Sequence, residues 1–133
     1  MKLEALSFFN LASQRLEWLG ARQKVIAENV ANADTPGFKA RDVSSFEDML
    51  SRTSQSGGIN TTARGHITSS GEIAPGVRAV ADETAWDTRV DGNTVTLEQQ
   101  TLRSNEVASS YQMAAQLYRK GYEVMTLAVS GQK

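Results

Sequence analysis

Hydrophobic side chains recur every seven residues near both ends of this chain. Between residues 2 and 33, two interleaved heptad sets can be read: Lys2, Phe9, Leu16, Gln23 and Val30, and Ala5, Ala12, Leu19, Ile26 and Ala33. Eight of these ten positions are apolar, which is the pattern of a coiled-coil seam. We therefore predict a long N-terminal helix with a seam formed by Phe9, Leu16, Leu19, Ile26 and Val30.

A second heptad pattern covers residues 97–129. Its two sets are Leu97, Ser104, Tyr111, Tyr118 and Met125, and Thr101, Ala108, Ala115, Tyr122 and Val129. The predicted seam residues are Tyr111, Tyr118, Tyr122 and Met125. Two helices of matched length at the two ends of one chain favour an antiparallel, coiled-coil-like pair, so the predicted fold class is mainly α. Gly20 and Gly121 fall inside these helices, where each costs about 1 kcal/mol relative to alanine. Either this cost is simply tolerated, or the glycines allow close helix approach.

Each predicted helix also carries a second apolar stripe. Leu11, Trp18 and Val25 lie two residues out of phase with the first seam, which is about 200° of helical rotation. In the second helix the additional apolar residues are Met113, Leu117, Val124 and Leu127. A helix that is apolar on opposite faces is buried on both. Because the polar middle of the chain offers little cover, we expect other chains to cover the second stripes.

The middle of the chain has a different composition. Residues 51–76 consist mostly of Ser, Thr, Gly and other polar residues, which bury too little apolar area to offset their ordering entropy. We expect a mobile arm here, then a short strand at residues 77–80 and a turn at Asp91-Gly92. The predicted organisation is a helix over 1–34, a turn and an extended or mobile segment over 35–96, and a helix over 97–130. Together these form one core domain.

The first helix ends in an unusual stretch, NVANADTPGFKARD, at residues 29–42. Thr35 precedes a proline, so the helix should end at Ala33 or Asp34. Pro36 and Gly37 suit the two central positions of a type II turn. Asn32 and Asp34 can hold the exit through hydrogen bonds to nearby backbone groups. The turn either serves this chain alone or sets the angle at which the chain leaves a packed assembly.

Composition and charge exclude several other classes of protein. The chain has 133 residues, a net charge of −1 and no cysteine. It shows no basic stripe for a nucleic-acid partner and no apolar run long enough for a membrane span or a signal-peptide core. His66 is the only histidine, so no zinc site is expected. Asp82, Glu83 and Asp87 form an acidic group beside Trp86, which we interpret as solvated. We predict neither catalysis nor a cofactor.

The stretch at residues 27–38, AENVANADTPGF, resembles the N-terminal signature A-N-N-I-A-N-x-x-T-x-G-[FY] of the bacterial flagellar axial proteins. This family comprises the rod, hook and hook-associated subunits. Glu28 departs from the commoner asparagine or alanine. The continuation through Asp42 is most similar to the proximal rod branch, as are the DGNTV stretch at residues 91–95 and the Tyr111-Gln112 pair. The resemblance covers about residues 1–45 and 89–130.

This resemblance implies a structural subunit at the base of the flagellar rod. The implied partners are copies of the chain, other rod proteins, the FliE adaptor and the base formed by the MS ring and export gate. The implied export route is the flagellar type III apparatus, without a cleaved signal peptide, to the periplasmic part of the basal body. The implied assembly motif is Asn29, Asn32, Asp34, Thr35, Pro36, Gly37, Phe38, Arg41 and Asp42. An alternative interpretation is a soluble helical adaptor or export-chaperone-like binding module.

Overall fold

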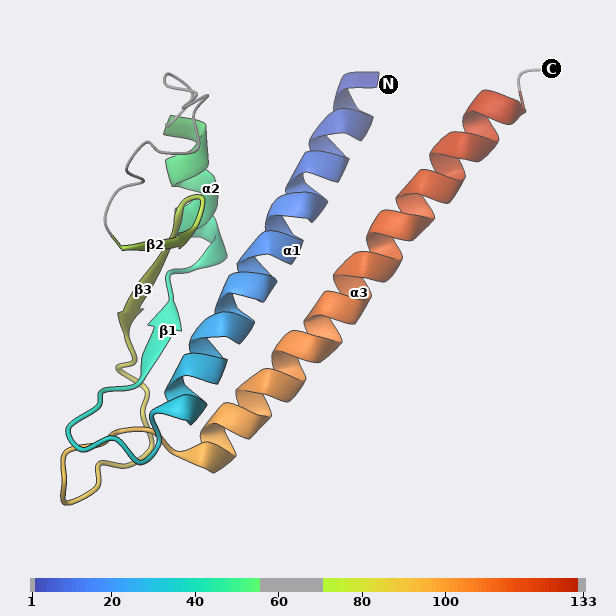
Figure 1. The fold of residues 1–133 in the computed structure, drawn as a ribbon. Helices are drawn as coiled ribbons and strands as arrows, with labels where there is room; N and C mark the ends of the chain where they lie inside the picture. The colour runs from blue at the N-terminus through green and yellow to red at the C-terminus, as the bar shows by residue number, and fades with distance from the viewer. Residues whose placement is uncertain (1, 56–70, 132–133) are drawn as a thin grey trace.

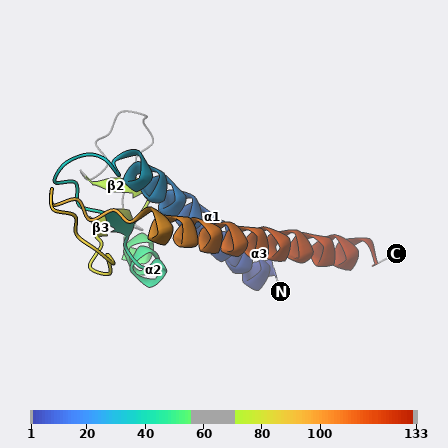
Figure 2. The ribbon, with the colours of Figure 1, turned by 90° about the horizontal axis from the view of Figure 1, so that it is seen from below.

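Two long antiparallel helices dominate the computed structural model, which describes residues 2–55 and 71–131. Helix α1 spans Lys2–Ala31 and helix α3 spans Leu97–Ser130. They lie side by side, with the two ends of the chain together at one end of the pair (Figure 1), and they cross when viewed from below (Figure 2). The prediction of a mainly α fold with an antiparallel helix pair is confirmed.

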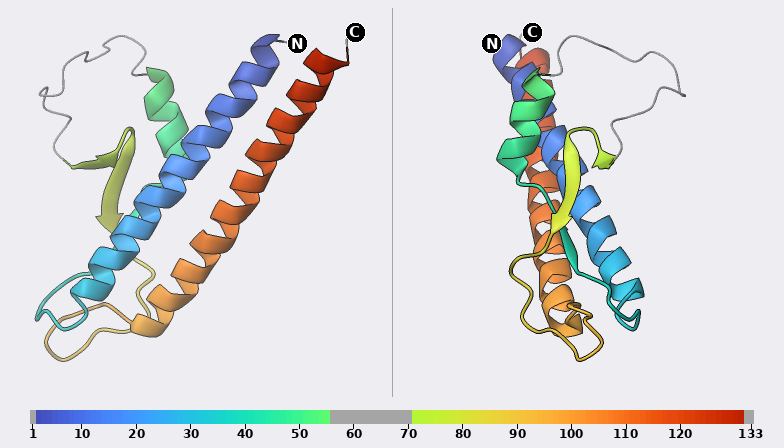
Figure 3. Two further views of the ribbon diagram at one scale, coloured as in Figure 1. Left: turned by 45° about the vertical axis from the view of Figure 1, so that its right-hand side comes forward. Right: turned by 90° about the vertical axis from the view of Figure 1, so that its left-hand side faces the viewer.

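Helix α1 is the central element of the fold. It contacts α3 on one side, and on the other side it contacts the three strands and the short helix α2, Phe46–Gln55 (Figure 3). This arrangement explains its second apolar stripe, because Trp18 and Val25 are only 8% and 0% exposed within this single chain. The expectation that other chains must cover this stripe is therefore wrong for Trp18 and Val25. Leu11, nearer the start of the helix, stays exposed.

Three short strands form a small antiparallel sheet in the order β1-β3-β2. Their bounds are Arg41–Val43, Glu72–Ala74 and Val77–Ala81 for β1, β2 and β3. In the register of β1 on β3, Asp42 lies opposite Val80, and a bulge interrupts the pairing of β2 with β3. The predicted strand at residues 77–80 is present as β3. Neither β1 nor β2 was expected, because three-residue strands leave almost no alternation of polar and apolar residues to read.

Helix α2 was not predicted, although its sequence contains a start signal. Ser45 is followed three residues later by Asp48, and the Ser45 hydroxyl accepts a hydrogen bond of 3.2 Å from the Asp48 amide. This is the N-terminal half of a capping box. Met49 is fully buried, which secures the helix against α1. The expectation of a mobile arm is wrong for residues 51–55 and 72–76, and residues 56–70 lie outside the described part of the chain.

The buried core occupies only one half of the helix pair. Its larger cluster contains Trp18, Leu19, Ala21, Val25, Ile26, Val43, Met49, Val77 and Val107. Among the described side chains, none in α1 before Trp18 and none in α3 after Val107 is buried. We call residues 18–31 and 97–107 the inner half of the pair, and residues 3–17 and 108–130 its open ends.

The two helix glycines play different roles. A Cβ atom on Gly121 would lie 2.6 Å from a ring carbon of Phe8, which is too close for any real side chain. Gly121 therefore makes room on α3 for the ring of Phe8 from α1. A Cβ atom on Gly20 would meet nothing within 4 Å, so the structure gives no steric reason for that glycine.

Candidate functional site

Asn29 is fully buried and joins three segments of the chain. Its side-chain amide donates to the Arg41 carbonyl at 2.7 Å, and its side-chain carbonyl accepts from the Arg41 amide at 3.0 Å. The same amide also donates to Gln100 Oε1 at 3.1 Å. The side chain thus pairs with Arg41 as a neighbouring strand would, while also binding α3. Gln100 was not expected from the sequence, because a buried glutamine in a helix has no distinctive local pattern.

Asn93, from a distant part of the sequence, forms hydrogen bonds to the backbone just after α1. Its side-chain amide donates to the carbonyls of Asn32, Ala33 and Thr35 at 2.9, 3.1 and 2.8 Å. Its side-chain carbonyl accepts from the Val95 amide at 2.8 Å. These carbonyls follow the last residue of α1, Ala31, so the buried asparagine ties the exit from the helix to the segment that leads into α3. The DGNTV stretch was recognised in the sequence, but the role of Asn93 was not.

The predicted turn at Pro36-Gly37 is present. The Phe38 amide donates to the Thr35 carbonyl at 3.2 Å, and Gly37 has a φ of 73°. This combination is the type II turn that the residues predict. Asn32 stabilises the end of α1 as expected. Its side-chain amide donates to the Glu28 carbonyl at 2.8 Å, and its side-chain oxygen accepts from the Thr35 hydroxyl at 3.2 Å.

Phe38 and its charged neighbours find their partners within the chain. Phe38 packs on the small cluster of Ala33, Ala40 and Val95. Arg41 pairs with Glu28 at 3.0 Å, and Asp34 lies 3.5 Å from Arg89. Such exposed pairs contribute roughly 0–1 kcal/mol each. Contacts of Phe38 and Arg41 with neighbouring subunits therefore stay predictions. We call residues 29–42 and 91–95 the motif joint.

Asp42 belongs to a partly buried ionic network that links four elements. It accepts from Arg22 of α1 at 3.3 Å and lies 3.9 Å from Arg103 of α3. Arg103 donates to Asp82, just after β3, at 2.6 Å. Partial burial alone would raise the pKa of Asp82, but hydrogen bonds from Arg103 and Thr84 outweigh it and hold the pKa below its ordinary value. The network fixes β1 and the end of β3 against both helices.

The indole of Trp18 locks the sheet side of α1. Its N–H donates to the Ser44 carbonyl at 2.8 Å, and its ring meets that of Phe46 edge to face at 6.1 Å. The Arg15 guanidinium lies over both rings, at 4.7 Å from the Trp18 centroid and 4.9 Å from the Phe46 centroid. Cation–π contacts of this kind contribute about 0.5–1 kcal/mol at exposed sites. The inner half therefore holds its own secondary structure together without a second chain.

The predicted seam is closed in the inner half and open beyond it. Leu19 and Ile26 are buried between the helices, while Val30 is 46% exposed at the end of α1. Leu16 and Phe9 are half-buried, and the Phe9 ring meets that of Tyr118 at 5.1 Å. Tyr111, Tyr122 and Met125 are exposed. The structure thus brings the two predicted seams together, but most of the seam residues of α3 remain exposed.

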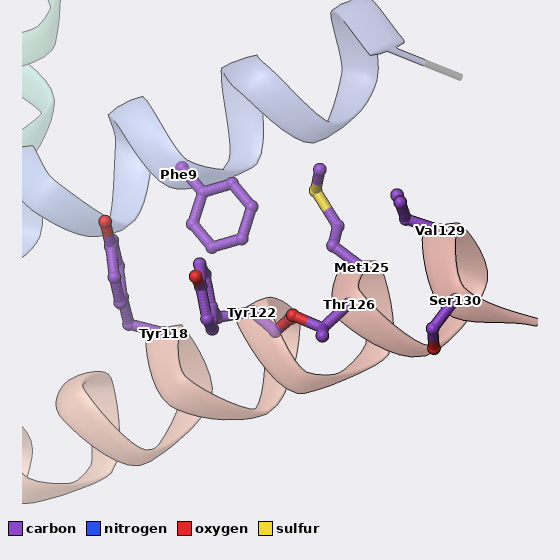
Figure 4. Close-up of a pocket in the computed structure, with 7 residues that line it drawn as sticks. All are labelled: Phe9, Tyr118, Tyr122, Met125, Thr126, Val129 and Ser130. Carbon is purple, nitrogen blue, oxygen red and sulfur yellow. The ribbon is translucent and has the colours of Figure 1, made fainter.

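The open ends form an apolar surface with a groove. Figure 4 shows Phe9 reaching from α1 towards Tyr118 and Tyr122 of α3, with Met125 and Val129 further along. The groove has a volume of about 520 Å³ and is lined by Phe9, Tyr118, Tyr122, Met125, Thr126, Val129 and Ser130. We call it the open groove. The second stripe of α3 is also uncovered, since Met113 and Leu127 are 70% and 71% exposed. Contiguous apolar surface of this kind marks interaction sites.

The described residues hold no cluster suited to metal chemistry. In residues 2–55 and 71–131, no group of three or more His, Cys, Asp or Glu side chains is placed to bind a metal ion. His66 lies outside this part of the chain. Asp82 forms an ion pair with Arg103. Glu83 and Asp87, near Trp86 in the sequence, are exposed. No helix in the described ranges is both long and apolar enough to cross a membrane.

The motif joint and the uncovered apolar ends define a structural class of paired terminal helices, and sequence comparison identifies the family. Residues 9–39 match the family described as flagella basal body rod protein. The chain is 35% identical to the flagellar basal body rod protein FlgB of Agrobacterium fabrum over 130 residues, 96% of each chain. It is 34% identical to FlgB of Aeromonas hydrophila, over 96% of this chain and 92% of the relative.

A further relative, FlgB of Escherichia coli, is 30% identical over 85% of this chain and 84% of its own length. The chain therefore belongs to the FlgB family of flagellar basal body rod proteins. It is a structural protein of the flagellar basal body and not an enzyme. The family match includes Asn29, Asn32 and the Thr35–Phe38 turn, which make up much of the motif joint.

Proposed function

We propose that the chain is a structural subunit of the proximal rod and that it polymerises through the open ends of its two terminal helices. The observation that carries this proposal is the contrast between the two halves of the helix pair. The inner half is tied by Asn29, Asn93 and the Asp42 network. The open ends expose Leu3, Met113, Leu127 and Val129. Burying such side chains yields roughly 1.5–3 kcal/mol each, which neighbouring helices would supply.

In this proposal the subunit links the base of the flagellum to the rest of the rod. Its neighbours are copies of itself and other rod proteins, with the FliE adaptor and the base of MS ring and export gate on the membrane-proximal side. It reaches the periplasmic side of the basal body through the flagellar type III apparatus without a cleaved signal peptide. The family membership supports these assignments, and flagellum assembly and motility would depend on them.

The alternative is a soluble helical adaptor or export-chaperone-like module. Such a module grips one partner helix and forms a closed complex of fixed stoichiometry. The apolar surface here is not confined to one cleft, because the exposed residues of α3 lie both on the open groove and on the second stripe. This two-sided exposure favours contacts with several neighbours at once and therefore the rod subunit.

The test uses cells that lack the native gene copy and are complemented with variants of this chain. Met113→Glu and Leu127→Glu place charges at exposed positions, so the isolated protein should unfold as the wild type does. We expect both variants to abolish swimming and to be missing from isolated basal bodies. Gln116→Glu, an exposed polar position on the same helix, is the matched control. Normal basal bodies containing both variants would refute assembly through the open ends.

A further inference from the structure

An exposed tryptophan lies at the end of the molecule opposite the open groove. Trp86 is 60% exposed and sits in the loop that connects β3 to α3. This loop lies at the end of the helix pair away from both termini (Figure 1). Tryptophan is highly buried on average in folded chains and is enriched at protein interfaces. An indole left this exposed in one chain therefore indicates a surface that another molecule covers.

Two carboxylates lie close to this tryptophan in the sequence. Glu83 and Asp87 are exposed, and neither forms an ion pair within the described residues. The backbone amide of Thr88 donates to Asp87 at 2.8 Å, which fixes that carboxylate beside the loop. We call residues 83–87 the loop knob. It combines one large exposed aromatic group with two exposed carboxylates within five residues.

The open groove has the complementary chemistry. It is lined by the aromatic and aliphatic side chains of Phe9, Tyr118, Tyr122, Met125 and Val129. A cavity of roughly 150 Å³ holds a benzene ring, so the groove, at about 520 Å³, has room for an indole. Arg119 lies three residues before Tyr122 and is its neighbour on the helix surface. Arg119 makes no ion pair in residues 2–55 or 71–131.

We infer that the loop knob of one copy enters the open groove of a second copy, with Trp86 against the tyrosines and Glu83 or Asp87 facing Arg119. Within one chain the two features cannot meet, because α3 runs from Leu97 to Tyr118, the first groove residue on that helix, over about 32 Å at 1.5 Å per residue. A contact between two different surfaces generates an open row of subunits when its rotation does not close a ring. The inference rests on the proposed function and names the partner of the open groove.

Directed cross-linking tests this contact, because the chain contains no cysteine. Thr88→Cys places a thiol beside the loop knob, and Ser130→Cys places one in the lining of the open groove. The double variant, treated with a short bismaleimide at high protein concentration, should give a ladder of dimers, trimers and larger species. A mixture of the two single variants should stop at dimers. A double variant with Glu47→Cys on α2 in place of Thr88→Cys should give no ladder.

Substitutions in the contact provide the decisive comparison. Trp86→Ala in the cross-linking background should weaken association about 30-fold, the effect of truncating an interface tryptophan. Val90→Ala, at another exposed apolar position of the same loop, is the matched control and should leave the ladder intact. Arg119→Glu should reduce the ladder, and adding Glu83→Arg and Asp87→Arg should restore it. An unchanged ladder in Trp86→Ala, or equal ladders from the Glu47→Cys and Thr88→Cys double variants, would overturn the inference.

The same cysteine variants separate this inference from the proposed function. They are expressed in cells lacking the native copy, and motility, basal-body content and cross-links are measured together. Three results together support both the proposed function and the head-to-tail contact: restored motility, the chain present in basal bodies, and a Thr88–Ser130 cross-linked ladder. Restored motility with the chain in basal bodies but no ladder, or with Ser130→Cys linked only to a different protein, refutes the head-to-tail contact and leaves the proposed function standing. A chain missing from basal bodies refutes the proposed function itself.

Discussion

Asn29 pairs with Arg41 through both backbone groups of that residue, with bonds of 2.7 Å and 3.0 Å to its carbonyl and amide. A side chain at the end of α1 thereby takes the place of a neighbouring strand for the residue that begins β1. Because the same side chain also binds Gln100 of α3, the exit of the chain from one helix is set relative to the other. The motif joint is thus one hydrogen-bonded unit made from both ends of the sequence.

Asn29→Ala should lower the free energy of unfolding by about 2–4 kcal/mol. It removes three hydrogen bonds and leaves the buried oxygen of Gln100 and the Arg41 backbone without their partner, and each such group costs about 1–3 kcal/mol. Urea unfolding of the purified chain measures the loss. Asn105→Ala, the same change at an exposed position of α3, should stay within about 0.5 kcal/mol of wild type. Equal stabilities of the two variants would show that Asn29 has no structural role.

Asn93→Asp should destabilise the chain more than Asn93→Ala does. The wild-type amide donates to three carbonyls of the α1 end, whereas an aspartate has no donor and would place a negative charge against three carbonyl oxygens. The alanine variant removes only the Asn93 donor, and each carbonyl keeps one other donor: the Thr35 amide for Asn32, the Arg89 guanidinium for Ala33 and the Phe38 amide for Thr35. Unfolding curves at neutral pH rank the two variants. The opposite ranking would mean that the three contacts do not govern stability.

Replacing Pro36-Gly37 by Ala-Ala should separate folding from assembly. Alanine at position 37 must either adopt the positive φ of 73°, at a cost of about 1–2 kcal/mol, or shift the turn and redirect Phe38. The core around Trp18 lies elsewhere, so circular dichroism of the monomer should show its helix content retained or raised. Rod assembly should fail, as judged by motility and basal-body isolation. Complete rods at normal yield would show that the turn serves only its own chain.

Amide hydrogen exchange on the dilute monomer should divide each long helix in two. Amides of residues 18–31 and 97–107 should be protected, because these segments surround the buried core. Amides of residues 3–17 and 108–130 should exchange faster, since local stability follows buried apolar contact and none of these side chains is buried. Uniform protection along all of α3 would contradict the division into an inner half and open ends.

The Asp82–Arg103 pair should make stability depend on pH only in acid. The pKa of Asp82 is below its ordinary value of 3.8 in the folded chain, so its contribution is fully present above that value and is lost as pH falls through the folded pKa. Arg103, whose pKa is raised further by this pairing although its burial opposes the rise, stays charged throughout. The stability difference between wild type and Asp82→Asn should therefore shrink below about pH 3.8.

Glu17→Gln, at an exposed position of α1, serves as the control for the pH experiment. Its difference from wild type at neutral pH should be small, because the side chain is exposed. Denaturant unfolding between neutral pH and acid pH measures both variants. A difference for Asp82→Asn that stays constant below pH 3.8 would show that the ionised carboxylate is not what stabilises the pair.

From the sequence alone we could predict the two long helices, the strand at residues 77–80 and the turn at Pro36-Gly37. These features rest on local rules: heptad periodicity between Phe9 and Val30 and between Tyr111 and Met125, and the conformational limits of proline and glycine. The signature at residues 27–38 also pointed to the rod proteins before any contact was known. The features that could be predicted are therefore those set by the spacing and the backbone preferences of residues close together in the sequence.

The surfaces that the chain covers for itself could not be predicted in this way. The stripe of Trp18 and Val25 gives the same periodic signal as that of Met113 and Leu127, yet the first is buried by β1, β3 and α2 while the second is exposed. Gln100 is 71 residues from Asn29, and the three carbonyls bound by the Asn93 amide are 58–61 residues away from it. Burial and hydrogen bonding depend on which segments meet in space, and periodicity along one helix carries no information about what lies opposite each face.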